Sequence, residues 1–298
     1  MKAKLGMIVA AAALLLAACG GTDAADQGKP AGKPVDVGAP LPANVQQKGK
    51  LAVGVKCDYP PFGYIDEAGE NAGFEIDVAH RLAAYAFGDP GAVELTCVTG
   101  SNRVPFLTTN RIDLIMATMN YTPERAETID FTSPYFAGGV KMLVPADSSV
   151  RGWDDLSGKQ VITIKGSTAS LWLTQCMPDV EQVQFEQTSE AVTALAQDRA
   201  VAFAQDDTLL VDLASKNKAT KVVGEVRADS PWGMGVRKGD TATKAWVDAA
   251  IKKLQDEDLF WKAFQESVSD KATQQQFEKV IPRPGNELSY PTGSIIEC

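Results

Sequence analysis

The chain has 298 residues and a formal net charge of −9, with 45% hydrophobic and 22% charged residues. This composition is typical of a globular protein, and the acidic balance argues against a nucleic-acid binder, which needs a clustered basic surface. The single histidine, His80, argues against Ser-His-Asp or Cys-His catalysis and against a His-rich metal site. We therefore expect no catalytic residues, no metal and no cofactor.

The N-terminus has the pattern of an export signal. Two lysines precede an apolar run of twelve residues at 7–18, which is too short for a bilayer span of about twenty residues. We predict a signal peptide at 1–18, with a transmembrane anchor as the alternative. Its removal leaves 280 residues with a formal charge of −11. Residues 16–19, Leu-Ala-Ala-Cys, resemble a bacterial lipobox, which implies that Cys19 becomes a lipidated N-terminus.

The segment after this cysteine has the composition of a linker. Residues 20–44 contain five glycines, four prolines and five alanines, and no aromatic residue. Such a segment cannot bury enough apolar surface to offset the entropy of ordering it. We predict a lipidated, flexible tether at 19–44 that holds a folded body outside the cytoplasmic membrane, at the cell membrane or the outer membrane.

From residue 45 on, the chain alternates between the residue periods of strands and helices. A first round consists of strands at 51–55, 93–98, 112–116 and 140–144 and helices at 74–87 and 104–109. This strand–helix–strand order predicts a parallel sheet with right-handed crossovers.

A second round follows with the same architecture. It consists of strands at 160–164, 180–185, 200–203, 221–223 and 232–236 and helices at 168–173, 189–197, 208–215 and 241–268, the last with a break near 256–258. The two rounds predict two α/β lobes, with binding expected at the carboxyl ends of their strands.

Four cysteines remain after Cys19, an even number in an oxidising compartment, and they allow three disulfide pairings. The chain has no CxxC motif, so a redox or zinc site has little support. Cys57–Cys97 is favoured because both residues lie at the carboxyl ends of strands that we expect to be neighbours. By elimination, Cys176 would then pair with Cys298, and four free thiols are the alternative.

Several motifs resemble those of one known family. They are Gly73–Val78 followed by Leu82-Ala83, Thr122–Arg125 followed by Ile129–Thr132 and Pro134-Tyr135, Gly166–Thr168, Ala204–Asp207, and Gly233–Val236. In order and spacing they resemble the bacterial extracellular solute-binding proteins of family 3, the amino-acid receptors of ABC importers. The resemblance covers about residues 45–270.

The resemblance implies an α/β fold of the type II periplasmic-binding-protein class, with two parallel or mixed sheets flanked by helices. The chain would cross between the lobes near 137–139 and 230–233, and the lobes would close on a ligand like a hinge. The implied division is 45–138 plus 233–283 for lobe 1, 139–232 for lobe 2, and a C-terminal tail at 284–298.

A free amino acid in a dry cleft needs a forked donor for its carboxylate and an acceptor for its ammonium group. The resemblance implies that Arg125 binds the carboxylate and Asp206 the ammonium group. The alternatives are a solvated arginine at a helix end and a helix N-cap. The family pattern adds bonds around Thr118 and Thr168.

Two further positions carry over from the family. Tyr59 matches an aromatic residue that packs over the ligand, and a loop aromatic beside Phe62 is the alternative. Asn120 departs from the pattern, because relatives have Ser or Thr there, which leaves its ligand atom open.

Specificity depends on residues that follow two predicted strands. Lys56 and the segment Ser101-Asn102-Arg103 resemble the glutamate/aspartate-binding branch, where the matching arginine binds the side-chain carboxylate of the ligand. The alternative is that Lys56 pairs with Asp58 or Glu75, and Arg103 with Asp113.

The resulting hypothesis is a monomeric, lipid-anchored receptor, not an enzyme, that passes L-glutamate or L-aspartate to ABC permease subunits. One alternative is a receptor for a neutral polar amino acid such as glutamine. The other is an enzyme similar to cyclohexadienyl dehydratases, for which Glu186 or Glu190 would have to supply the general acid.

Overall fold

The computed structural model describes residues 32–293 and 295–298. The predicted signal peptide at 1–18, the lipidation site Cys19 and the tether up to residue 31 lie outside these residues. Within the described part, no helix is both long and apolar enough to cross a membrane.

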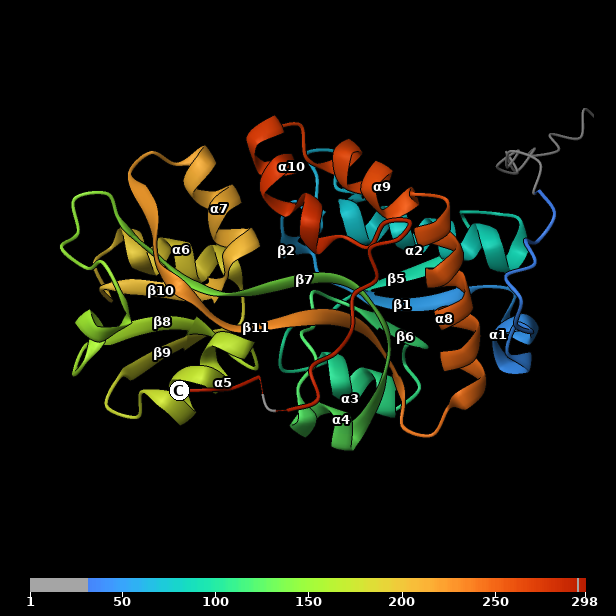
Figure 1. Ribbon diagram of the computed structural model, residues 1–298, viewed down its shortest axis with the longest axis horizontal. Helices are drawn as coiled ribbons and strands as arrows, with labels where there is room; N and C mark the ends of the chain where they lie inside the picture. The colour runs from blue at the N-terminus through green and yellow to red at the C-terminus, as the bar shows by residue number, and fades with distance from the viewer. Residues whose placement is uncertain (1–31, 294) are drawn as a thin grey trace, which may run out of the picture. The chain divides into compact units, whose positions relative to one another are not determined.

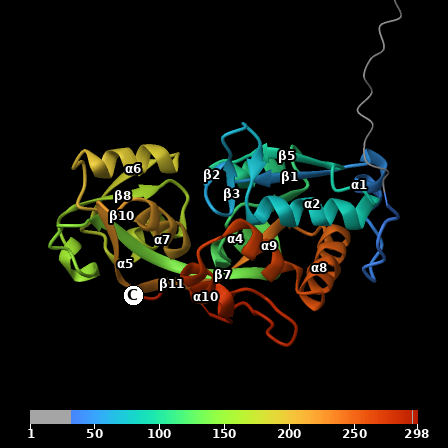
Figure 2. The same ribbon diagram turned by 90° about the horizontal axis from the view of Figure 1, so that it is seen from above.

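The described chain forms two lobes joined by two long strands, and Figure 2 shows this division. The joining strands are β7 (Ile129–Pro145) and β11 (Thr220–Arg237). The larger lobe contains α1 (Ala43–Lys48), β1 (Leu51–Val55), β2 (Asp58–Tyr59), β3 (Gly63–Ile65), β4 (Asn71–Ala72), α2 (Phe74–Phe87), β5 (Val93–Cys97), α3 (Arg103–Thr108), β6 (Leu114–Met116), α4 (Pro123–Thr128), α8 (Thr241–Asp256), α9 (Leu259–Ser267), α10 (Lys271–Phe277) and η2 (Glu278–Val280). The smaller lobe contains η1 (Trp153–Leu156), β8 (Gln160–Ile164), α5 (Thr168–Cys176), β9 (Glu181–Phe185), α6 (Thr188–Ala196), β10 (Ala202–Asp206) and α7 (Asp207–Lys216).

The main sheet has the strand order β5-β1-β6-β11-β7-β10-β8-β9. β1 is parallel to β5 and β6 in the larger lobe, and β8 is parallel to β9 and β10 in the smaller lobe, as the crossovers predict. Figure 1 shows β7 and β11 running through both lobes. The predicted α/β class with two lobes is confirmed. Binding residues at the carboxyl ends of β1 and β8 therefore face each other across the space between the lobes.

The two joining strands are longer than the sequence predicts. The strands expected at 221–223 and 232–236 are parts of β11, and the strand expected at 140–144 is the second half of β7. Their antiparallel pairing shifts register between Val223 and Arg227 and again on either side of Gly233. These irregularities interrupt the two-residue alternation by which a strand is detected in sequence. Gly138 pairs with Ser230 in this stretch, and the assignment of a hinge there stays a prediction.

The helix of the family motif forms over the residues expected. α2 begins after Gly73, whose φ of 117° and close contact with the Phe62 carbonyl leave no room for a Cβ. It buries the apolar stripe Ile76, Ala79, Leu82 and Ala86 against the core of the larger lobe. The predicted break in the later helix lies between α8 and α9, where Asp258 adopts a left-handed φ of 56°.

Both disulfides have the pairing that the sequence favoured. Cys57–Cys97 joins the ends of the neighbouring parallel strands β1 and β5, with a Cα–Cα distance of 5.5 Å. Cys176–Cys298 joins the end of α5 to the chain terminus at 5.1 Å.

The C-terminal tail contacts both lobes. On the larger lobe, the Tyr290 ring stacks on Tyr121 at 4.6 Å between centroids, and its hydroxyl donates to the Thr132 carbonyl at 2.6 Å. On the smaller lobe, Ile295 is buried in the core, and the disulfide through Cys298 holds the end.

The ordered body begins earlier than the composition suggested. Residues 32–44 were assigned to the tether, yet Val35 and Leu41 pack against the core of the larger lobe, and the Val35 N–H donates to the Tyr85 carbonyl at 2.9 Å. The few apolar residues in this proline-rich stretch find a groove on the larger lobe, which composition by itself does not reveal. Within the described chain, residues 32–44 thus belong to the folded body and not to the tether predicted at 19–44.

Candidate functional site

A buried pocket lies between the lobes at the ends of β1, β8 and β10. The larger lobe lines it with Lys56, Tyr59, Gly100, Arg103, Thr118 and Asn120, and the smaller lobe with Ile164, Ser167, Thr168, Gln205 and Asp206. Seven of the nine residues that the sequence singled out are in this lining, the exceptions being Ser101 and Arg125.

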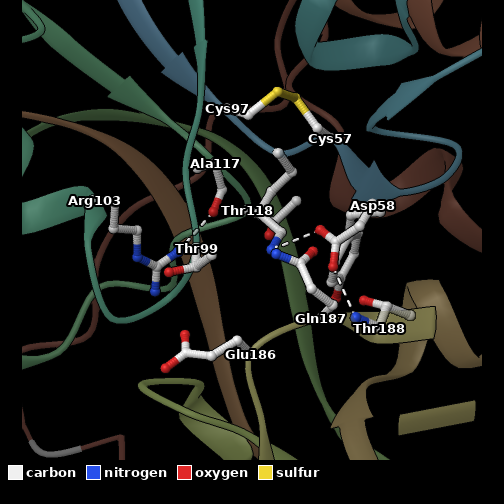
Figure 3. Close-up of polar contacts among 12 residues, drawn as sticks. Cys57, Asp58, Cys97, Thr99, Arg103, Ala117, Thr118, Glu186, Gln187 and Thr188 are labelled. Atoms are coloured by element: carbon white, nitrogen blue, oxygen red, sulfur yellow. Dashed lines mark hydrogen bonds and ion pairs between the residues drawn. A yellow bond between two sulfur atoms is a disulfide. The ribbon is translucent and has the colours of Figure 1, made fainter. Parts of the chain in front are cut away.

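Lys56 lines the pocket and is paired with a carboxylate. Its Nζ lies 2.8 Å from Asp58 Oδ1, while only 6% of the lysine side chain is exposed. The second oxygen of Asp58 accepts a hydrogen bond from the backbone N–H of Thr188 at 2.8 Å, at the first residue of α6. Figure 3 shows Asp58 facing Thr188 from the opposite lobe. Half of the alternative from the sequence is thus correct, because Lys56 does pair with Asp58.

Arg103 has no such partner. Its guanidinium donates to the Ala117 carbonyl at 2.6 Å, as Figure 3 shows, but no carboxylate of the described residues lies within 4.0 Å of it. Asp113, the partner proposed in the alternative, binds Lys48 at 2.7 Å instead. Burial lowers the pKa of Arg103 from its ordinary value. The charges of Asp206 and Glu75 favour the charged form of Arg103, but neither carboxylate forms an ion pair with it. A buried guanidinium without an ion pair is costly and can accept a further anion.

Arg125 lies beside the lining residues at the third position of α4. Its guanidinium donates to the Asn120 carbonyl at 2.8 Å, to Thr168 Oγ1 at 3.3 Å and to the Gly166 carbonyl at 3.0 Å. All three acceptors are neutral, and no ion pair to Arg125 exists in the described chain. Burial, and next the nearby charge of Arg103, lower the pKa of Arg125 to about 9. The charges of Asp206 and Glu124 act in the opposite direction, but Arg125, like Arg103, forms no ion pair within the described residues.

Asp206 provides an acceptor at the end of β10. Its Oδ2 accepts a hydrogen bond from the Tyr59 hydroxyl at 2.7 Å, whereas its buried Oδ1 has no partner among the described residues. Asp206 occupies the N-cap position of α7, as the alternative expected, but its side chain makes no capping bond there. Burial raises the pKa of Asp206 to about 6, because the charged form has lost its hydration.

The amide and hydroxyl groups predicted to bind ligand form hydrogen bonds within the protein. Asn120 donates through Nδ2 to the carbonyls of Gly138 and Ser230 at 3.0 Å each, which ties together β7 and β11. Asn120 Oδ1 accepts from Thr168 Oγ1 at 2.9 Å. The substitution of Asn for the family's Ser or Thr thus connects the pocket to the two joining strands.

A carboxylate holds the Thr118 backbone in place. The Thr118 N–H donates to Glu75 Oε1 at 2.8 Å, and the Tyr135 hydroxyl donates to the same oxygen. Burial raises the pKa of Glu75 to about 7. The backbone N–H of Thr118 is therefore engaged by Glu75, and the expectation of ligand bonds around Thr118 stays a prediction.

Ser101 is an exposed residue at the rim rather than in the lining. Its hydroxyl donates to Glu186 Oε2 at 2.7 Å, and the same carboxylate lies 3.4 Å from Lys165 Nζ. The bond from Ser101 lowers the pKa of Glu186. An exposed carboxylate that is held ionised in this way is poorly suited to act as a general acid.

Sequence reasoning missed two features of the pocket. Gln205 lines it next to Asp206, and its Oε1 accepts from the Asp206 N–H at 3.0 Å. Gly100 allows the lobes to touch, because a Cβ there would lie 2.5 Å from the Lys165 carbonyl. Gly166 has a φ of 72°, and a Cβ there would lie 2.7 Å from the Gly100 carbonyl. The paired glycines were the available signal, since glycine marks close backbone approaches.

Residues 51–266 match the family described as bacterial extracellular solute-binding proteins, family 3. The chain is 33% identical over 253 residues to the ABC transporter glutamine-binding protein GlnH of Bacillus subtilis, covering 84% of this chain and 91% of that protein. It is 27% identical over 259 residues to the L-glutamate/L-aspartate-binding protein of Pseudomonas aeruginosa, covering 83% of each. The crystal structure of a cysteine-binding protein from Campylobacter jejuni is similar with a TM-score of 0.75 and 37% identity, covering 77% of this chain and 92% of that one.

Proposed function

Because the chain belongs to family 3 of the bacterial extracellular solute-binding proteins, we propose that it is a receptor that binds an acidic amino acid between its lobes and delivers it to an ABC permease. In this proposal Cys19 anchors a monomeric receptor outside the cytoplasmic membrane through its lipid. The predicted tether then lets the two lobes reach the permease subunits.

The choice of an acidic ligand depends on the charges left unpaired in the site. Arg103 and Arg125 are two guanidiniums without a carboxylate partner in the described residues, and Asp206 has one oxygen without a hydrogen bond. A molecule with two carboxylates and one ammonium group satisfies all three. L-Glutamate and L-aspartate have this set, with Arg125 binding the α-carboxylate and Arg103 the side-chain carboxylate.

L-Glutamine is the second candidate. The Bacillus relative is a glutamine-binding protein, and Lys56, which the acidic hypothesis counted as a free cation, is paired with Asp58. A glutamine side chain would meet Arg103 through its amide oxygen, which is a weaker acceptor than a carboxylate and leaves the buried charge unneutralised.

Isothermal calorimetry against L-glutamate, L-aspartate, L-glutamine and L-cysteine tests the proposal. We expect nanomolar-to-micromolar binding of an acidic amino acid, equivalent to about −8 to −12 kcal/mol. Tight binding of glutamine with none of glutamate would replace the acidic ligand by the neutral one. Binding of none of the four would contradict the proposed receptor function.

The affinity should depend on pH through Asp206. Burial raises its pKa to about 6, so without a ligand the carboxyl group keeps its proton above the ordinary range of an aspartate. The ligand's ammonium group favours the ionised form, so binding releases the proton and the affinity rises with pH. Below pH 6 the dissociation constant should increase by up to about tenfold per pH unit. Calorimetry between pH 5 and 7.5 measures this slope, and a flat profile would contradict the assigned role.

A further inference from the structure

The smaller lobe is bonded to the larger lobe at both ends of one short segment, 186–188. At one end, Ser101 Oγ donates to Glu186 Oε2 at 2.7 Å. At the other end, the backbone N–H of Thr188 donates to Asp58 Oδ2 at 2.8 Å. Figure 3 shows Glu186 and Thr188 on the same stretch of chain, below the residues of the larger lobe. We call Asp58, Ser101, Glu186 and Thr188 the clasp.

Each carboxylate of the clasp is also held by a lysine of its own lobe. Asp58 Oδ1 lies 2.8 Å from Lys56 Nζ, and Glu186 Oε1 lies 3.4 Å from Lys165 Nζ. In each carboxylate, the lysine orients one oxygen, and the other oxygen accepts a hydrogen bond from the opposite lobe. The acceptors are therefore positioned before the lobes meet, which reduces the entropy lost when the cross-lobe bonds form.

The clasp residues lie next to the pocket but do not line it. None of the four residues belongs to the lining, although their neighbours Lys56, Tyr59 and Gly100 do. At Gly100, next to Ser101 in the chain, the contact with Gly166 brings the lobes together backbone to backbone. The clasp bonds can therefore exist only when the lobes are closed, whatever occupies the pocket.

From this arrangement we propose that the clasp is a positioning device that stabilises the closed receptor and slows ligand release without selecting among ligands. The inference rests on the proposed receptor function. Closure contributes the same free energy to every ligand whose complex is mainly closed, so the clasp scales all dissociation constants by one factor. The pocket residues, Arg103 above all, then decide the order of preference. Ser101, expected from the sequence to bind ligand, is assigned to closure instead.

Ser101→Ala and Glu186→Ala test the clasp, with L-glutamate and L-glutamine as probes in stopped-flow and calorimetry experiments. Each variant should raise both dissociation constants by about 3- to 10-fold, mainly through faster release. The double variant should be no weaker than either single variant, because both remove the same bond. Glu181→Ala is the matched control, since Glu181 is an exposed carboxylate of the smaller lobe bonded to Gln160 of the same lobe, and it should change neither constant.

The outcomes separate the clasp from the receptor function. A change of more than about threefold in the ratio of the two dissociation constants would place Ser101 or Glu186 on the ligand and overturn the clasp. Unchanged constants in both variants would also overturn it. If the unmodified protein binds neither probe, the proposed ligands are wrong, and small-angle X-ray scattering of the ligand-free protein decides about the clasp. A larger radius of gyration in Ser101→Ala and Glu186→Ala than in Glu181→Ala supports it, and equal radii reject it.

Discussion

Replacing Arg103 by methionine is expected to weaken L-glutamate binding by about 100-fold or more, while L-glutamine binding weakens by less than about tenfold. Arg103 is 5% exposed, lines the pocket and lacks an ion pair in the described residues. Only an acidic ligand supplies a second carboxylate for Arg103, beyond the α-carboxylate assigned to Arg125. Methionine keeps the apolar stem and much of the volume of the side chain but removes the charge. The loss of affinity therefore reports on the contact with the ligand's side-chain carboxylate.

Arg125→Met provides the contrast for this experiment. Arg125 is assigned to the α-carboxylate, which every amino acid has, so its loss should weaken L-glutamate and L-glutamine binding by similar factors, again about 100-fold. Calorimetry with both ligands on both variants gives the four constants needed. Equal losses of affinity for the two ligands in Arg103→Met would show that Arg103 does not recognise the side chain of the ligand.

A thermal scan controls for misfolding in these variants. A buried guanidinium without an ion pair costs stability, so removing it should not lower the melting temperature without ligand. A clear drop for Arg103→Met would mean that its bond to the Ala117 carbonyl is structural. In that case, Arg103→Lys, which keeps the charge, becomes the informative variant.

The double substitution Cys176→Ser/Cys298→Ser is expected to lower the free energy of unfolding by about 2–5 kcal/mol. The disulfide joins positions 122 residues apart, which restricts the unfolded chain strongly. It also holds the last residues, including buried Ile295, against the smaller lobe. Without it the tail retains its contacts at Tyr290 on the larger lobe and loses its fixed end on the smaller lobe.

Cys57→Ser/Cys97→Ser is the matched control, because that disulfide spans 40 residues. Chain entropy alone makes its loss about 1 kcal/mol less costly than that of the longer loop. Urea unfolding of the oxidised protein and both variants measures the difference. An unchanged unfolding midpoint in Cys176→Ser/Cys298→Ser would show that the C-terminal bridge adds no stability, as the free-thiol alternative requires.

The local residue pattern was sufficient to predict the helices and strands whose successive residues have the same surroundings. The helix at 74–87 and the strands at 51–55 and 160–164 have the predicted bounds, because one face of α2 is apolar and the two strands are short and apolar. β7 and β11 could not be predicted whole, since their extended course through 134–139 and 224–231 depends on each other's hydrogen bonds and not on alternation. The short docked segment at 32–44 shows the same dependence on a distant surface.

The sequence by itself determined three features of the chain: the export signal pattern, the even number of cysteines after Cys19, and the presence of a few cations in an acidic chain. The tertiary structure decided which of those cations are unpaired. Lys56 is neutralised by Asp58, which Thr188 of the other lobe holds in turn, while Arg103 is buried without a carboxylate partner in the described chain. Lys56 and Asp58 are two positions apart, but the carboxylate of Asp206, which acts on Arg103, is more than a hundred positions away from it. Only folding and closure of the lobes set such distances.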